Sequence, residues 1–292
     1  MPNLKDIRRR IRSVKKTQQI TRAMRMVAGA KLRRAQNAVT QARPYAERMR
    51  ATLAEVARVP QDTVHPLLAP RPQPKRAEVV VVTSNRGLCG AFNANVLRFA
   101  DRLVAARERE GVAVTITCVG RKAVEYFARR RRRQLGGKHI FDGWVSYESA
   151  AELAGQLSGR FASGDSDEIL LVFSEFVSAL SQTPRSARLL PAAPDAPEAA
   201  VGEASLPVEI EPSAEKLIAV LVPKAIEVEI FRALLENQAG EHAARMASME
   251  AATRNTEDLI SRLTLQFNRA RQAAITKELV EIVSGAEALK SS

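Results

Sequence analysis

One long helix is predicted over residues 4–58, LKDIRRRIRSVKKTQQITRAMRMVAGAKLRRAQNAVTQARPYAERMRATLAEVAR. This stretch has no proline before Pro44 and a single glycine, Gly29. Apolar or small residues recur in alternating steps of four and three, which is the heptad pattern of a coiled coil. They are Ile7, Ile11, Val14, Ala28, Leu32, Ala35, Val39, Ala42, Ala46, Met49, Leu53 and Val56. A stripe this narrow has to be buried against another helix.

A second long helix is predicted from Pro223 to about Leu289, because this region contains no further proline. Its apolar positions include Phe231, Leu235, Met249, Ala252, Leu259, Leu263, Phe267, Ala270, Val280 and Val283. Since a folded segment separates the two helices, we expect them to pair as a long antiparallel coiled coil. The numbers of facing residues should then add to about 282, within one turn. Leu32 would face the neighbourhood of Glu250, and Ile11 that of Arg271.

The predicted seam turns polar in places. The polar positions are Gln18, Thr21 and Arg25 in the first helix, and Gln238, His242, Arg245, Gln266, Arg269, Arg271 and Gln272 in the second. Polar seam residues weaken a coiled coil, so they indicate either control of register or contact with an outside partner.

An α/β domain is predicted between the helices. Residues 59–77 carry five prolines and read as a connector. Strands and helices then alternate, which favours a Rossmann-like domain with a mainly parallel sheet. We expect strands at 78–83, 112–119, 139–145 and 168–173, helices at 93–109, 121–132 and 149–161, an edge strand or hairpin within 174–190, a return strand at 206–211 and a short helix at 213–222. The expected parts are therefore 1–58 (coiled-coil helix), 59–77 (linker), 78–206 (α/β domain) and 207–292 (return strand, short helix and second coiled-coil helix).

The net charge of +13 lies in one part of the chain. Residues 1–58 hold 16 lysines and arginines against 3 acids, and the remaining residues balance at 29 against 29. A charge confined to one helix indicates an acidic protein or a nucleic acid as the partner of that helix.

No active site can be nominated from the sequence. Cys89 and Cys118 form no CxxC pair, which argues against a disulfide framework or a zinc site and suggests a reducing cytoplasm. The turn SNRGLCG (84–90) lacks the lysine of a P-loop and the GxGxxG of a dinucleotide site, so a structural turn is favoured over a phosphate site. Cys89 is either a reactive thiol or, more commonly at such a position, a buried filler. We expect no cofactor, no metal and no catalytic residue.

Several motifs resemble one family. The segments IRSVKKTQQITRAMRMVA (11–28), SNRGLCGAFN (84–93), EHAARM (241–246) and NRARQAAITKELVEIVSGA (268–286) closely resemble the gamma subunit of the F-type, proton-transporting ATP synthase. The resemblance spans the chain and is strongest at both ends. The regulatory cysteine insert of the chloroplast form is missing, which indicates a bacterial type.

The resemblance implies a central-stalk rotor without an active site of its own. Its coiled coil would lie inside the ring of alpha and beta subunits, and its α/β domain would form a foot that holds the epsilon subunit and the ring of c subunits. Rotation of the proton-driven c ring would drive the catalytic beta subunits through their states. The chain would be peripheral, on the cytoplasmic face of the bacterial inner membrane, and would bind the membrane only through the complex.

The resemblance also implies contact residues. Those expected to meet the beta subunits are Met24, Arg245, Arg271, Gln272, Thr276, Glu278 and Glu281. Glu211, in the stretch Ile210-Glu211-Pro212, is expected to meet the c ring. The family often has aromatic residues just before this glutamate, whereas the chain has Val208 and Ile210.

Two alternatives come from other classes of protein. The sequence pI of about 10.3 and the run of five arginines at 129–133 suggest a basic coiled-coil protein that binds nucleic acid. No aromatic platform accompanies the arginines, so a solvated helix end is the simpler interpretation. The other alternative, a small α/β enzyme with a helical dimerisation arm, lacks a catalytic set.

Overall fold

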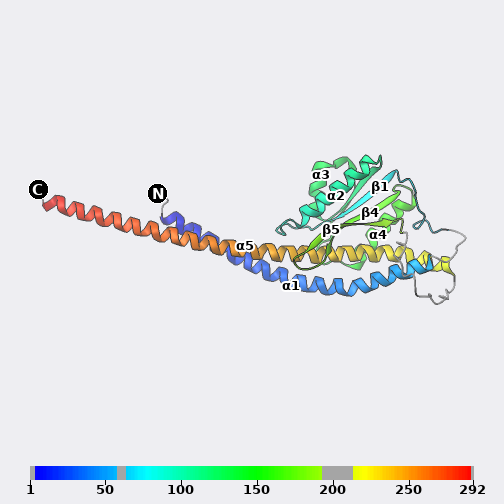
Figure 1. The fold of residues 1–292 in the computed structure, drawn as a ribbon, viewed down its shortest axis with the longest axis horizontal. Coiled ribbons are helices and arrows are strands. Elements are labelled where there is room, and N and C mark those ends of the chain that lie inside the picture. Colours follow the sequence, from blue (N-terminus) through cyan, green and yellow to red (C-terminus); the bar gives the residue numbers. More distant parts are fainter. Residues whose placement is uncertain (1–3, 58–63, 193–212, 291–292) are drawn as a thin grey trace, which may run out of the picture. The chain divides into compact units, whose positions relative to one another are not determined.

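The structure is a computed structural model that describes residues 4–57, 64–192 and 213–290. The chain forms two compact units (Figure 1). The helical unit comprises Met1–Ala28 and Met246–Ser292, and the mixed unit comprises Gly29–Arg245. The return strand predicted at 206–211 lies outside the described residues, as does Glu211.

Two helices, α1 (Leu4–Val56) and α5 (Ala214–Lys290), run through both units. On α1 the heptad prediction is confirmed, because all of its predicted seam positions are buried or half-buried. The helices are antiparallel in each unit: partners of rising number on α1 have falling numbers on α5.

On α5 most of the predicted seam is confirmed as buried or half-buried, but it is wrong at Leu259, Val280 and Val283, whose side chains are exposed. The confirmed positions are Phe231, Leu235, Met249, Ala252, Leu263, Phe267 and Ala270. In the helical unit the buried and half-buried positions include Met249, Thr253, Thr256, Ile260, Leu263, Phe267, Ala270 and Ala274. These positions also alternate in steps of four and three. The pattern was hidden in the sequence because two of its members are threonines.

The predicted register is wrong in the helical unit. The hydroxyl groups of Thr21 and Thr253 lie 2.9 Å apart, and Arg25 lies 3.8 Å from Glu250. The numbers of these partners add to 274 and 275, so Glu250 faces a residue about two turns away from Leu32. Ile11 was expected near Arg271. The α1 residue found in that neighbourhood is Arg8, whose guanidinium lies over the ring of Phe267. The predicted sum of about 282 rested on the expectation that the second helix begins at Pro223.

The predicted short helix that ends before Pro223 is also wrong, because α5 begins at Ala214 and continues through this proline. A proline inside a helix removes one backbone hydrogen bond and disfavours the helical conformation. Here Ile218, Val222 and Ile226 on successive turns are buried in one core, and this packing offsets the loss.

The mixed unit contains a five-stranded sheet in the order β3-β2-β1-β4-β5. Strands β1 to β4 are parallel, and the predicted edge strand is confirmed as β5, which runs antiparallel to β4. The strands are β1 (Arg76–Val82), β2 (Ala113–Val119), β3 (Leu135–His139), β4 (Glu168–Phe176) and β5 (Gln182–Leu190). The helices of this region are α2 (Phe92–Arg109), α3 (Arg121–Arg130), the short 3-10 helix η1 (Arg132–Gln134) and α4 (Tyr147–Ala162). The predicted α/β domain with a mainly parallel sheet is therefore confirmed.

Strand β3 precedes the predicted strand at 139–145, which was placed too late. Its sequence LGGKH contains two glycines, which are poor strand formers. Both are needed for close approach to β2: a Cβ on Gly136 would lie 2.4 Å from the Thr115 side chain, and one on Gly137 would lie 2.9 Å from that of Thr117.

Two apolar cores cover the two faces of the sheet. One face packs against α2 and α3, and the other packs against α4 and the mixed-unit parts of α1 and α5. Consequently one segment of α5 is enclosed in this unit, because every residue from Ala233 to Gly240 is buried.

Candidate partner surfaces and the joint between helices and sheet

The helical unit exposes apolar side chains on α1 around Met24. Ile20, Met26 and Val27 are between 57% and 61% exposed, and Met24 is half-buried. Single exposed apolar residues are ordinary, but several within two turns of one helix indicate a contact surface.

The polar seam residues of α1 have partners within the chain. Gln18 Nε2 donates a hydrogen bond to Glu257 at 3.1 Å, the Thr253 hydroxyl donates to that of Thr21, and Arg25 faces Glu250. These contacts support the interpretation that the polar positions control register. Contact of these residues with an outside partner stays a prediction.

The predicted contact residues near the end of α5 lie together on an unpaired stretch of helix. Arg271, Gln272, Thr276, Glu278 and Glu281 are all exposed, as is every residue from Ile275 to Ala286. This stretch also carries large apolar side chains that are 49–68% exposed, namely Ile275, Leu279, Val280, Ile282 and Val283. The helical unit therefore presents a mixed apolar and polar surface with nothing in the described chain against it.

Arg245 has different surroundings, in the mixed unit. Its guanidinium lies 2.6 Å from Glu241 and donates a hydrogen bond to the Gly87 carbonyl oxygen at 3.2 Å, and its side chain is only 12% exposed. Arg245 is therefore engaged within the mixed unit, whereas the other described contact residues belong to the helical unit.

His242, one turn before Arg245, is held neutral. Its ring lies edge-on to Trp144, and the guanidinium of Arg34 stacks over the same indole at 4.2 Å. Burial, with a further contribution from the charges of Arg245 and Lys31, lowers the pKa of His242 to about 4. Trp144 thus fastens the loop after β3 to both long helices, through His242 of α5 and Arg34 of α1.

The glycine turn uses its polar groups internally. The Ser84 N–H donates to Asn93 Oδ1 at 3.0 Å, and the Ser84 hydroxyl donates to the Arg86 carbonyl oxygen. Burial raises the pKa of the Cys89 thiol, which disfavours a reactive thiolate. These contacts favour the structural turn over a phosphate site and the buried filler over a reactive thiol. Leu88 points outward, with a left-handed φ of 63° and 65% exposure.

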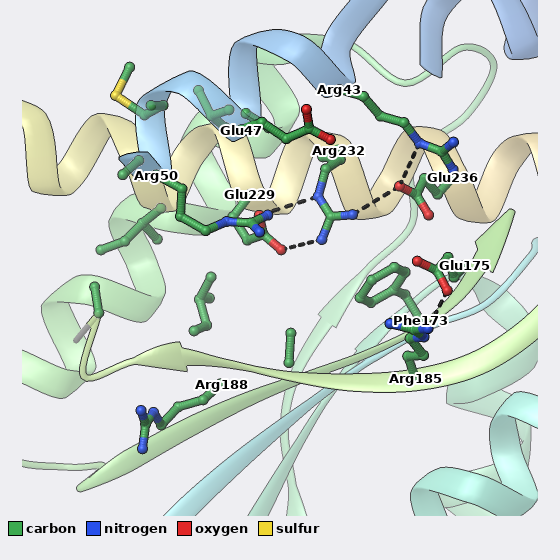
Figure 2. A pocket seen from close by; sticks show the side chains of 18 of the residues that line it. Arg43, Glu47, Arg50, Phe173, Glu175, Arg185, Arg188, Glu229, Arg232 and Glu236 are labelled. Atoms are coloured by element: carbon green, nitrogen blue, oxygen red, sulfur yellow. Dashed lines mark hydrogen bonds and ion pairs between the residues drawn. The ribbon is translucent and has the colours of Figure 1, made fainter. Parts of the chain in front are cut away.

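The mixed unit has an open groove of about 860 Å³ between α1, α5 and the strands β4 and β5. Figure 2 shows the side chains that line it. Its wall carries a ladder of alternating charges from the two helices. The ladder consists of Arg43 and Arg50 from α1, and Glu229, Arg232 and Glu236 from α5. The groove is lined by both charged and apolar side chains, which suits contact between the two helices and the sheet and does not indicate one class of ligand.

Neighbouring charges in this ladder lie within 3.4 Å of each other. Arg232 contacts Glu229 at 2.5 Å and Glu236 at 2.9 Å, Arg50 lies 3.0 Å from Glu229, and Arg43 lies 3.4 Å from Glu236. Burial opposes the charged form of Glu229, but Arg232 and then Arg50 outweigh it and keep the pKa of this carboxyl below its usual value. Burial likewise opposes the charge on Arg232, and the two glutamates outweigh it and raise its pKa.

Sequence reasoning missed this ladder. The spacing of Glu229, Arg232 and Glu236 puts three charges on one face of α5, and such a face is usually solvated. The signal that could have identified it is its position within an otherwise apolar segment, followed by Asn237 and Gln238.

A family model described as ATP synthase matches residues 3–289. The chain belongs to the ATP synthase family. A relative named ATP synthase gamma chain from Anaeromyxobacter sp. (strain Fw109-5) is 49% identical, over 99% of the chain and 100% of the relative. Another of the same name from Chlorobaculum tepidum is 47% identical over the same shares.

Solved structures of ATP synthases share the fold. A chain in the Euglena gracilis mitochondrial enzyme, in a structure of its F1 part and c-ring, matches with a TM-score of 0.68 and 21% identity, over 98% of the chain and 94% of that chain. One in the central stalk and c-ring of the Tetrahymena thermophila enzyme matches with a TM-score of 0.60 and 25% identity, over 80% and 99%.

The nucleic-acid alternative receives no support from these relatives. Within the run of five arginines, Arg131 is paired with Asp101 and Glu108, and Arg130 stacks on Tyr126. These contacts within the chain support the simpler interpretation of the arginines as a charged helix end. Among the described residues, none of the helices is both long and apolar enough to span a membrane, and no group of acidic, His or Cys side chains could hold a metal ion.

Proposed function

We propose that the chain is the rotor of the central stalk of an ATP synthase. The rotating c ring turns the chain, and the coiled coil drives the catalytic beta subunits through the states that bind substrates and release ATP. ATP hydrolysis turns it in the opposite direction. The partners are the alpha and beta subunits, the epsilon subunit and the c ring.

One observation carries this proposal: the chain matches gamma chains of bacterial ATP synthases over its full length at 45–49% identity. In the proposal, residues 1–58 and the helical part of 207–292 act as the shaft, 59–77 as a connector and 78–206 as the foot. The 16 basic residues of the first part suit acidic loops on the beta subunits.

The exposed end of α5 is proposed to meet the beta subunits. Arg271 and Gln272 can donate hydrogen bonds, Thr276 can donate or accept them, and Glu278 and Glu281 can pair with cations. The neighbouring apolar side chains would lie in an apolar sleeve within the ring of subunits.

Met24 and Arg245 complete the proposed beta-subunit contacts. Met24 lies among the exposed apolar residues of α1. Arg245 would reach a beta subunit only by sharing or leaving its pair with Glu241, which lies 2.6 Å away. The proposed contact of Glu211 with the c ring rests on the resemblance alone.

The chain is further proposed to have no catalytic activity of its own and to work as a peripheral protein on the cytoplasmic face of the bacterial inner membrane. The purified full chain should neither bind nor hydrolyse ATP. Micromolar binding with turnover, measured by calorimetry and phosphate release, would contradict the first part. Protease digestion of inverted and right-side-out vesicles that carry the complex tests the second part, and digestion should occur only in inverted vesicles.

The test of the rotor itself replaces the gamma gene of a bacterial strain with the gene for this chain. We expect the chain to co-purify with the alpha, beta, epsilon and c subunits and to restore ATP-driven proton pumping in inverted vesicles. If the alpha, beta, epsilon and c subunits formed a complex that pumps protons without this chain, the proposal would be overturned.

Met24→Lys tests the contact surface. A new cation on α1 should form a charge-assisted contact with an acidic loop and resist rotation, so that fewer protons are pumped per ATP hydrolysed. The control is Ser13→Lys, on an exposed position of the same helix. Equal pumping ratios in wild type and Met24→Lys would argue against this surface.

A further inference from the structure

The main chain of Phe176, where β4 ends, is held from two sides. Its N–H donates a hydrogen bond to Glu236 Oε2 on α5 at 3.3 Å, and its carbonyl oxygen accepts one from Arg43 on α1 at 2.7 Å. The same Arg43 contacts the Glu236 carboxylate at 3.4 Å. One carboxylate therefore joins two helices and the end of a strand.

This carboxylate is fully buried, with a side-chain exposure of 0%. A buried charge is tolerated only when it is paired and hydrogen-bonded, and Glu236 receives Arg232 at 2.9 Å in addition to Arg43 and the strand. Because these groups depend on one another, the contact forms completely or is lost as a whole.

The apolar core between the strands and these helices differs in kind. It is made of side chains such as Val80, Leu171, Ile226 and Ile230. Apolar burial is non-directional and resists separation more than sliding or rotation. Hydrogen bonds to both main-chain groups of one residue fix the strand end along and around the helices.

We infer that Arg43 and Glu236 are positioning residues that lock the sheet to the helix pair against twisting. The inference rests on the proposed rotor function, in which torque enters at the foot and leaves through the coiled coil. A loose joint would absorb part of each rotational step as twist in the foot, and the lock transmits it to the shaft.

The chain contains a matched control. Arg50 pairs with Glu229 at 3.0 Å and so joins α1 to α5 in the same groove (Figure 2). Arg50 and Glu229 make no hydrogen bond to the described strands. Removing Arg50 breaks a helix-to-helix pair and leaves Phe176 held.

The experiment measures torsional stiffness in the assembled ATP synthase. The catalytic ring is fixed and stalled with a non-hydrolysable ATP analogue, and a bead on the foot reports angular fluctuations. For Arg43→Gln and Glu236→Gln we expect the angular variance to rise about twofold, because the network is lost as a unit. Arg50→Gln should leave the angular variance at the wild-type value, even if it lowers the melting temperature as much as Arg43→Gln does.

Arg43→Lys guards against a variant that fails to assemble. A lysine keeps the charge but lacks the planar fork that reaches the carboxylate and the carbonyl together, so the variance should again rise. Wild-type variance in Arg43→Lys and Arg43→Gln would overturn the lock, as would an equal rise in Arg50→Gln. A wild-type complex that does not rotate at all would refute the proposed function instead.

Discussion

Two regions of α5 contrast in composition and burial. The segment Ala233–Gly240, ALLENQAG, is buried at every residue although it contains Glu, Asn and Gln. Residues 275–286, ITKELVEIVSGA, are exposed at every residue although five of them are large and apolar. Polarity alone does not separate the two regions, because 3 of 8 residues are polar in the first and 5 of 12 in the second. In the mixed unit Glu236 pairs with Arg43 and Arg232, and Gln238 donates to the Gly143 carbonyl oxygen, whereas the exposed apolar groups are available to other subunits.

The largest effect should come from Glu236→Ala. This variant leaves Arg43 and Arg232 without their buried partner, and breaking such a network costs about 3–5 kcal/mol. Urea unfolding of the full chain measures it. The control, Glu250→Ala, removes a half-exposed partner of Arg25 in the helical unit and should cost less than about 1 kcal/mol. Equal losses would mean that burial does not distinguish the two ion pairs.

A second effect should appear on acidification. The pKa of His242 in the folded chain is about 4, against 6.5 when unfolded, so the unfolded chain binds the extra proton between these values. Stability is therefore lost as the pH falls from 6.5 to about 4, by about 3 kcal/mol at about 1.4 kcal/mol per pH unit.

His242→Gln should flatten this part of the stability curve, followed by urea unfolding at several pH values. The control is His65→Gln, because the pKa of His65 is lowered by burial without nearby cations and should contribute less. An unchanged slope in His242→Gln would show that this histidine is already protonated in the folded chain.

A pair of glycines compares the two regions directly. In Gly240→Ala the new Cβ would lie 2.9 Å from the buried ring of Phe92, and overpacking of about 1–3 kcal/mol should exceed the helix-propensity gain of about 1 kcal/mol. In Gly285→Ala nothing lies within 4 Å, so only the gain remains. Thermal melting should move in opposite directions for the two variants, and a shift in the same direction would contradict the contrast.

The smallest effect on the free chain should come from Leu279→Gln with Val283→Gln. Both side chains are exposed, so the free energy of unfolding should change by less than about 0.5 kcal/mol. Binding to the ring of alpha and beta subunits should nevertheless weaken, as measured by surface-immobilised titration. A large loss of stability would mean that this end is packed within the free chain.

The sequence allowed the fold class to be predicted because α1 keeps a heptad spacing and the strands β1 and β2 are rich in β-branched residues. It failed where packing overrides local preference. The glycines of β3 are poor strand formers that fit only against Thr115 and Thr117, and Pro223 is tolerated because its neighbours are buried. Contacts between distant segments cannot be read from a one-dimensional pattern.

The candidate site was predicted unevenly for the same reason. The end of α5 was identified through a resemblance carried by residues 268–286, and its exposure agrees with a contact role. The spacing of the charges did not by itself show that Arg245 is buried against Gly87 or that the ladder around Glu236 is buried, because charges on a helix look alike whether they face water or another segment.

The pairing of α1 with α5 has a consequence during synthesis. The seam of α1 is complete on the ribosome when Val56 has been added, whereas its partner in the helical unit begins at Met246. At a synthesis rate of about 5–20 residues per second, the apolar stripe of α1 remains without its partner for roughly 10–40 seconds. Like charges repel one another, so the 16 basic residues of the first 58 can keep nascent chains from associating through these unpaired stripes. The charge that suits an acidic partner in the finished motor also protects the helix before that motor exists.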